Sequence, residues 1–341
     1  MQGRVAAGSL PAYLPTVLGF SAAGARQYQL LSALRELIAT AGDSPELEAA
    51  ALPALLGRAD DPDKSVRAAV AECLGQLPAA RVLPALPALL ALVPAEGALP
   101  SPALLYTAAA ATRHLQARVA GDGSAEALVT LVGRLLLCED LGAREEVLRL
   151  LLAALSRPDR LLTDSPAVAA RVLDSLAFKH IVEVDLGPFK QKNDLGLPLR
   201  RLALDCADLL LLRGSAALDP AALLGLLPAL LRDDDGVKLH AHKLLGRLCR
   251  DGRTSAAVGA AVDTLVEPLS KTVLTKPPEG KKGPDLERLL EVVRSAVRAV
   301  HCVAALPEAA ACAKWTEFVA RARSDPRVAE YLLAADTADG Q

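Results

Sequence analysis

Seven short segments with one helix-start pattern recur along the 341 residues, and their spacing most limits how this chain can fold. In six of them a small or aliphatic residue precedes a basic one, and in the seventh Leu104 takes the place of the basic residue. Successive segments are 37 to 41 residues apart four times and 56 residues apart twice. A period of about 40 residues is typical of HEAT and armadillo repeats, in which each unit is built from helices packed side by side. The seven pairs are Ala25-Arg26, Val66-Arg67, Ala103-Leu104, Ala143-Arg144, Leu199-Arg200, Val237-Lys238 and Val293-Arg294.

The apolar residues that follow these positions have the spacing of an amphipathic helix. From Val66 to Leu77 they fall at i, i+3, i+4, i+7, i+8 and i+11, and the segments from Leu199 and Val293 follow nearly the same pattern. Aromatic residues make up only 3% of the chain, whereas Ala and Leu, both strong helix formers, dominate its hydrophobic 52%. We therefore predict an all-α fold, a HEAT-repeat α-solenoid of about seven helical-hairpin units.

A second phrase supports this period. Leu-Pro-Ala-Leu-Leu occurs at 52–56, 86–90 and 227–231. Because the first turn of a helix leaves its N–H groups without intrahelical partners, we expect these prolines in first turns. Acidic residues precede the helices that begin near Arg67 and Lys238, where carboxylates can cap the helix and oppose its dipole.

Charge and hydropathy exclude several classes of function. The formal net charge is −2, without the basic excess that binding to nucleic acid or to an anionic membrane surface requires. No apolar stretch reaches the 18 or more residues of a membrane-spanning helix, and residues 1–15 lack the apolar core of a signal peptide. Six cysteines without C-x-x-C spacing predict reduced, mostly buried thiols. We expect a protein of the cytoplasm and nucleus, without nucleic-acid or membrane partners.

The two intervals of 56 residues indicate insertions. In the first, Val182, Val184 and Leu186 alternate with acidic residues and a Gly-Pro turn signal follows, which predicts a β-hairpin at about 180–193. The second, 270–285, is rich in Lys, Pro and Gly and predicts a mobile basic loop.

No constellation of residues predicts catalysis or a bound cofactor. The acidic triplet 233–235 lacks the alternating ligands, the Gly and the distal Glu of a Ca²⁺ loop, and it predicts a solvated turn between repeats. His240 and His242 point to different faces of a helix and complete no zinc set. Residues 280–283 lack the phosphate-loop sequence, and no Ser or Cys lies in a nucleophile-elbow motif. We predict a protein that is not an enzyme and that holds no metal and no cofactor.

Two phrases in the second half resemble a known family. Val184-Asp-Leu-Gly-Pro-Phe-Lys190, followed by Asp194-Leu-Gly-Leu-Pro-Leu-Arg200, is similar to the C-terminal domain of cullin-associated, neddylation-dissociated proteins. Leu265-Val-Glu-Pro-Leu269 and the segment from Arg294 to Val300 resemble it in the same order, and Leu10-Pro-Ala-Tyr-Leu-Pro15 extends the resemblance upstream.

The resemblance implies a HEAT solenoid that binds a cullin–RING scaffold and exchanges the substrate-receptor modules of ubiquitin ligases. It implies HEAT repeats at 1–168, a C-terminal cullin-binding domain at 169–335 and a disordered tail at 336–341. In this family the C-terminal end binds the N-terminal region of the cullin, and a hairpin there competes with the adaptor protein. We expect a monomer. The hairpin phrase assigns partner binding to Ile181, Glu183, Val184, Gly187, Pro188, Phe189 and Lys190.

Two alternatives remain open. From the residues alone the hairpin is more simply a structural insertion at the edge of a solenoid, although an exposed Pro and Phe at its tip would make a small apolar patch. The chain could also be a HEAT scaffold with another partner, of the nuclear-transport or phosphatase type.

Overall fold

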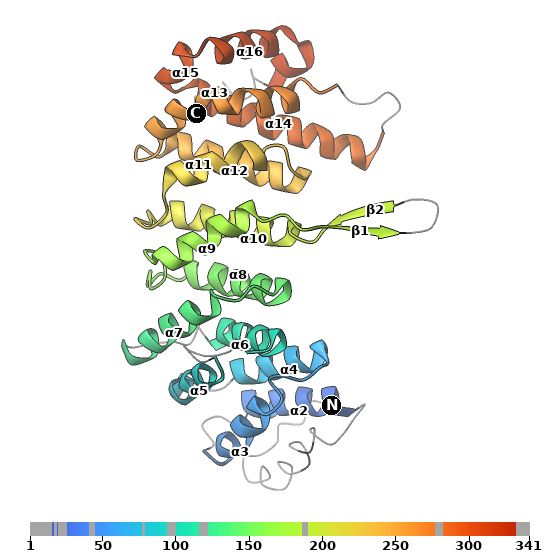
Figure 1. The fold of residues 1–341 in the computed structure, drawn as a ribbon, viewed down its shortest axis with the longest axis vertical. Coiled ribbons are helices and arrows are strands. Elements are labelled where there is room, and N and C mark those ends of the chain that lie inside the picture. Colours follow the sequence, from blue (N-terminus) through green and yellow to red (C-terminus); the bar gives the residue numbers. More distant parts are fainter. Residues whose placement is uncertain are drawn as a thin grey trace. The chain divides into compact units, whose positions relative to one another are not determined.

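The computed structural model describes residues 16, 19, 26–40, 45–76, 79–93, 100–115, 122–185, 190–276 and 282–331. The chain divides into two compact units, Met1–Arg171 and Val172–Gln341. Figure 1 shows that each unit is a stack of antiparallel helices, which confirms the predicted all-α fold. The division predicted between residues 168 and 169 separates HEAT repeats from a cullin-binding domain, and it stays a prediction.

The first unit is built from two rows of helices. In one row α2, α4, α6 and α8 contact one another in sequence, and in the other α5 contacts α7. α9 (Pro166–Ala177) crosses the division between the units. The helices of this unit are α2 (Gln27–Thr40), α3 (Pro45–Leu56), α4 (Lys64–Gly75), α5 (Ala79–Leu92), α6 (Pro102–Leu115), α7 (Asp122–Leu135) and α8 (Leu141–Leu155).

The second unit repeats this plan and adds a hairpin. One row holds α10, α12 and α14 in contact, and in the other α11 contacts α13, which also contacts α15 and α16. Its elements are β1 (Ile181–Asp185), β2 (Lys190–Asp194), α10 (Leu197–Leu212), α11 (Pro220–Leu230), α12 (Asp235–Arg250), α13 (Ser255–Val273), α14 (Pro284–Ala304), α15 (Pro307–Ala311) and α16 (Ala313–Ser324).

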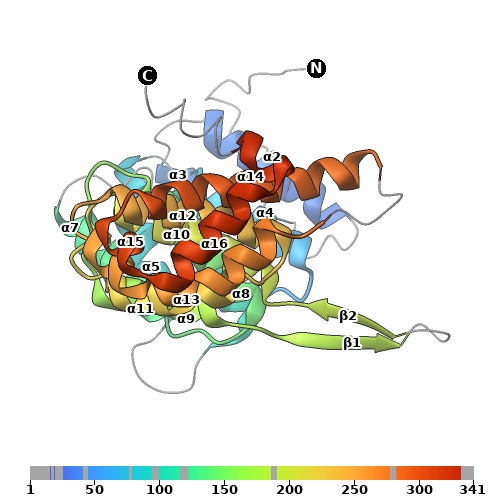
Figure 2. The same ribbon diagram turned by 90° about the horizontal axis from the view of Figure 1, so that it is seen from above.

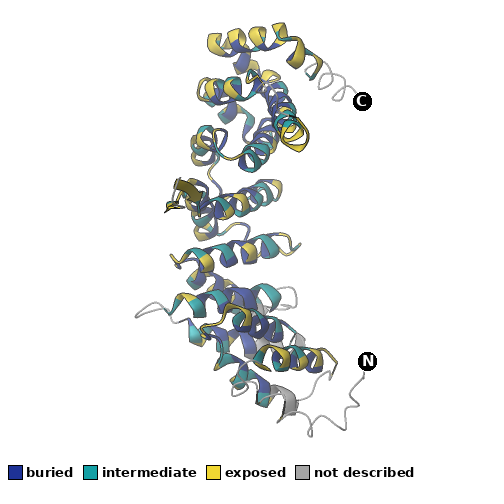
Figure 3. Ribbon diagram, turned by 90° about the vertical axis from the view of Figure 1, so that its right-hand side faces the viewer, coloured by how far each residue is buried: buried dark blue, intermediate teal, exposed yellow. Residues whose placement is uncertain are grey.

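The predicted repeat positions fall on one kind of helix. Arg26 directly precedes α2, and the other six pairs lie on α4, α6, α8, α10, α12 and α14. On α4 the predicted apolar stripe is buried from Val66 to Leu74, and in both units buried residues line the space between the two rows (Figure 3). No helix of a single unit could bury this stripe alone, so stacking supplies the core.

Acidic residues cap several of these helices, as predicted. The carboxylates of Asp63, Asp140, Asp219 and Asp234 accept hydrogen bonds from backbone N–H groups in the first turns of α4, α8, α11 and α12. Each cap satisfies an N–H group that lacks an intrahelical partner.

Arginines tie successive repeats together at the opposite helix ends. Arg134 of α7 donates from Nη1 to the carbonyls of Leu90 and Val93 at the end of α5, at 3.0 and 2.8 Å. Arg171 of α9 donates to the carbonyls of Leu136 and Cys138, which follow α7. Carbonyls in the last turn of a helix lack their regular intrahelical N–H partner, and cations are favoured at helix C-termini.

Two details of the sequence prediction are wrong. The prolines of the repeated phrase, Pro53, Pro87 and Pro228, lie inside α3, α5 and α11 and past their first turns. The segment 270–285 is partly helical: α13 continues to Val273, because Leu265, Leu269 and Val273 keep one buried stripe, and α14 begins at Pro284. Residues 277–281 of the predicted loop lie outside the described residues.

Two further expectations concern the cysteines and membrane-spanning helices. All six cysteines are free, and five are buried while Cys312 is partly exposed. Within the described ranges, no helix has the length and apolar character needed to cross a membrane.

The close approach of α4 and α6 generates a stability prediction. A Cβ added at Gly75 would overlap the Cβ of His114, whereas one added at Gly133 of α7 would meet nothing within 4 Å. Gly75→Ala should therefore lower the free energy of unfolding by about 1–3 kcal/mol through overpacking. Gly133→Ala should raise it by up to about 1 kcal/mol through helix propensity. Urea titration of both variants checks this, and equal effects would contradict it.

Candidate functional site

The β-hairpin is the one element in the described part of the chain that leaves the helical rows. Figures 1 and 2 both show it projecting from the start of α10. Its antiparallel register pairs Ile181 with Asp194 and Asp185 with Lys190. Most of its residues are exposed (Figure 3), among them Ile181 at 59% and Val184 at 38%. The helices therefore bury little of the hairpin, and its apolar side chains face solvent.

The register divides the hairpin into two different faces. On one face, opposite charges stand across the strands: Glu183 lies opposite Lys192, with 3.4 Å between carboxylate and ammonium, and Asp185 lies opposite Lys190. On the other face Val182 and Val184 lie opposite Asn193 and Gln191. Cross-strand charge pairs stabilise a ribbon modestly, so one face supports the hairpin and the other is uncharged.

A buried guanidinium holds the base of the hairpin. Arg200 of α10 is 1% exposed. Its Nη2 lies 2.6 Å from Asp194 Oδ2, at the end of β2, and 2.9 Å from Asp233 Oδ1, in the turn before α12. Its Nη1 donates to the Phe178 carbonyl, just before β1, at 2.9 Å. One side chain thus joins both ends of the hairpin to the next repeat.

The backbone closes tightly around this guanidinium. The Leu195 N–H donates to the His180 carbonyl at 2.8 Å, and the Gly196 N–H donates to Asp194 Oδ1 at 3.0 Å. A Cβ at Gly196 would lie 2.8 Å from the Phe178 carbonyl oxygen and 3.0 Å from the guanidinium. Glycine is required here because of this close approach.

The structure corrects the prediction of a solvated acidic turn at 233–235 at one of its three residues, because the side chains of Asp234 and Asp235 are 42% and 41% exposed whereas that of Asp233 is buried. The Asp233 carboxylate is only 6% exposed and also lies 3.2 Å from Lys179. Burial alone would raise the pKa of Asp233, but hydrogen bonds from the Asp234 N–H, Arg200 and Lys179 outweigh it and lower that pKa. Burial would also raise the pKa of Asp194. Hydrogen bonds from Arg200 and from the Gly196 N–H outweigh burial, and the pKa of Asp194 is lowered. Two cations and two carboxylates therefore form one charge-balanced cluster, which we call the Arg200 cluster.

The structure places only part of the predicted partner site. Ile181, Glu183 and Val184 lie on β1 and Lys190 begins β2. Gly187, Pro188 and Phe189 lie outside the described residues. Sequence reasoning missed the structural role of Asp194, Gly196 and Arg200, although their spacing carried the family resemblance.

Three buried thiols of the described part of the chain are held in their protonated form. Burial raises the pKa of the Cys73 and Cys249 thiols to about 12 and that of Cys138 to about 11. Protonated, buried thiols are poor nucleophiles. Within the described ranges, no group of three or more His, Cys, Asp or Glu side chains could hold a metal ion.

The Arg200 cluster generates a prediction with a neighbouring control. Arg200→Met would leave the Asp194 and Asp233 carboxylates without their main partner and should cost about 3 kcal/mol of stability. Arg201 is 47% exposed and binds the exposed Asp234, so Arg201→Met should cost about 1 kcal/mol or less. Urea unfolding measures both, and an Arg200 variant as stable as the Arg201 variant would contradict this account.

The lowered pKa values also predict acid sensitivity. The ionised carboxylates of Asp194 and Asp233 contribute fully to the free energy of unfolding above the ordinary Asp pKa of about 3.9. This contribution is lost as pH falls through their lower pKa values in the folded protein. Asp233→Asn should therefore be less stable at neutral pH but lose less stability on acidification than the natural protein. Urea midpoints across acid pH measure this, with Asp263→Asn, at an exposed position of α13, as the control. Parallel loss in the natural protein and in Asp233→Asn would refute it.

Two known families match separate parts of the chain. Residues 164–323 match the TIP120 family, described as TATA-binding protein interacting (TIP20), and residues 51–77 match the HEAT repeat. A crystal structure of an engineered protein aligns at a TM-score of 0.49 with 18% identity, covering 91% of this chain and 74% of that chain.

Curated relatives match nearly the whole chain. Over 99% of its length it is 31% identical to cullin-associated NEDD8-dissociated protein 2 of Mus musculus, of which it covers 28%. Over the same share it is 29% identical to cullin-associated NEDD8-dissociated protein 1 of Dictyostelium discoideum, again covering 28%. The chain thus spans just over a quarter of the length of these relatives. It is a relative of the cullin-associated NEDD8-dissociated proteins, as the resemblance of its hairpin phrases predicted.

Proposed function

We propose that this chain is a non-catalytic regulator of cullin–RING ubiquitin ligase assembly that binds the N-terminal region of a cullin. The β-hairpin is proposed to compete there with the adaptor that carries the substrate receptor. The observation that carries the proposal is an exposed, projecting hairpin with Ile181 and Val184 facing solvent. The names of the relatives support a cullin as the partner.

The hairpin has the properties of a binding element. An isolated two-stranded ribbon is marginally stable in water, yet this one is fixed at its base by the Arg200 cluster and braced by Glu183–Lys192. A ribbon held in place before binding loses less conformational entropy on association. Phe189, which directly precedes β2 in the sequence, would supply an aromatic anchor of the kind enriched at interface hot spots.

Exchange requires no chemistry in this mechanism. If the hairpin and the adaptor use overlapping surfaces on the cullin, occupancy by one excludes the other. The extended surface of the helical rows would supply the remaining binding energy. Lys190, at the start of β2, would favour an acidic surface on the cullin and affect the association rate most.

Binding to a purified cullin N-terminal domain, with and without saturating adaptor, tests the proposal. The chain should bind, and the adaptor should abolish binding. Val184→Ser combined with Phe189→Ala should weaken binding by at least about tenfold, because both remove apolar contact at the hairpin. Leu212→Ser removes a side chain that is 62% exposed at the end of α10 and should leave affinity within about twofold.

The outcomes separate the parts of the proposal. Binding that neither the adaptor nor the hairpin variant changes would retain the cullin partner and refute the hairpin mechanism. Absence of binding under conditions where a relative of full length binds would refute the cullin partner for this chain.

A further inference from the structure

A second surface lies between α12 and α14, away from the hairpin strands. A pocket of about 440 Å³ opens there, and a neighbouring pocket of about 440 Å³ continues it toward the first turns of both helices. The two share Leu239, His240 and Glu291, so they form one groove, which we call the α12–α14 groove. From Glu291 to Cys302 its wall spans three turns of α14, about 16 Å.

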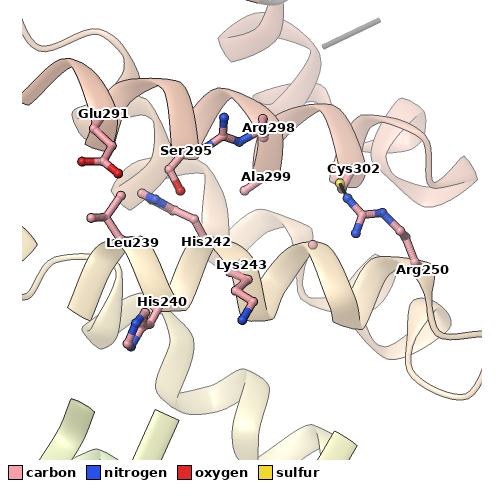
Figure 4. A pocket seen from close by; sticks show the side chains of 11 residues that line it. Leu239, His240, His242, Lys243, Arg250, Glu291, Ser295, Arg298, Ala299 and Cys302 are labelled. Atoms are coloured by element: carbon pink, nitrogen blue, oxygen red, sulfur yellow. Dashed lines mark hydrogen bonds between the residues drawn. The ribbon is translucent and has the colours of Figure 1, made fainter. Parts of the chain in front are cut away.

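One wall of the groove contains a buried polar side chain without a partner. His242 of α12 is 2% exposed, and neither of its ring nitrogens has a hydrogen-bond partner. Figure 4 shows its imidazole pointing from α12 toward Ser295 on α14. Burial, with smaller effects from Lys238 and Arg298, lowers the pKa of His242 to about 3, so the ring is neutral. A neutral imidazole offers one N–H donor and one acceptor, and leaving both unused is costly.

Two guanidinium groups that line the same pocket have no carboxylate partner in the described part of the chain. Within the described ranges, no salt bridge joins Arg298 or Arg250 to a carboxylate, and Arg250 donates only to Cys302 Sγ, at 3.2 Å. Lys243, on the same wall, is instead paired with Asp208 of α10 at 3.2 Å. In the pocket that holds His242, two cations without a carboxylate partner among the described residues lie on one side of His242 and Glu291 lies on the other (Figure 4). The neighbouring pocket adds the carboxylates of Asp234 and Asp235, which are paired with Arg201 and Lys238.

We propose that the α12–α14 groove binds an extended acidic segment of a partner protein, with carboxylates at Arg298 and Arg250. Carboxylates match guanidinium groups in geometry as well as charge, and the His242 N–H can donate to the same ligand. Backbone N–H groups of the segment can donate to Glu291 at the other end. At about 3.3 Å per residue, about five extended residues fill this length. This inference uses no residue of the hairpin and stands apart from the adaptor competition.

Fluorescence anisotropy with labelled hexaglutamate, at low ionic strength, tests the groove directly. Hexaglutamate should bind, and labelled hexaglutamine should not. Arg250→Glu with Arg298→Glu should weaken binding by at least about tenfold. The control is Arg321→Glu with Arg323→Glu on α16, which changes net charge equally at exposed positions outside the groove and should change affinity by less than about twofold.

A second readout separates the groove from nonspecific charge. His242→Leu should fold and should weaken hexaglutamate binding severalfold without any change of net charge. Bound hexaglutamate should slow amide exchange in α12 and α14. No binding of hexaglutamate, equal loss in both double Arg variants, or exchange protection confined to other helices would each overturn the proposal.

Discussion

Burying the guanidinium of Arg200 costs desolvation free energy, which its ion pairs and hydrogen bonds must offset. The local order of the second unit depends on these contacts. A buried charge is tolerated when it is paired and its donors are used. Here the positive charges of Arg200 and Lys179 are balanced by Asp194 and Asp233, and the Phe178 carbonyl takes a further donor. These groups come from the end of α9, the end of β2, α10 and the turn before α12. Loss of the hairpin's alignment would therefore remove Asp194, one of the two carboxylates that pair with this buried charge.

Other arginines along the repeats also donate hydrogen bonds between elements, to backbone carbonyls at helix ends. Arg134, Arg171 and Arg253 each reach back by 33 to 44 residues and donate to carbonyls at or just after the end of an earlier helix. A planar guanidinium can serve several acceptors at once, whereas a lysine ammonium is a point charge on a flexible stem. Stacked helices leave their C-terminal carbonyls near the next unit, so this contact follows from the repeat itself. This hydrogen bond is directional, so it fixes the relative position of neighbouring repeats, which apolar packing alone would not.

The sequence predicts what periodicity controls. The helices that carry or follow the seven repeated pairs, and the hairpin, follow from spacing, because amphipathic stripes and strand alternation are local patterns. Asp233 was misjudged because its burial depends on Arg200, which lies 33 residues earlier and only folding brings near. The α12–α14 groove could not be predicted, since His242 and Arg298 meet only across two packed helices. The prolines at 53, 87 and 228 were misplaced because composition alone does not say where a helix begins.

The Arg200 cluster also connects the two proposed binding surfaces. Asp233 contacts Arg200, and the next residue, Asp234, caps α12 through the Gly236 N–H. The helix that this cap starts then supplies His242 and Arg250 to the α12–α14 groove, while Asp194, on the other side of Arg200, ends β2. The hairpin and the groove are therefore set at a defined separation by a few short contacts within one unit. A partner that used both would meet a surface already assembled, and its affinity would gain from the linkage of the two sites rather than from new contacts.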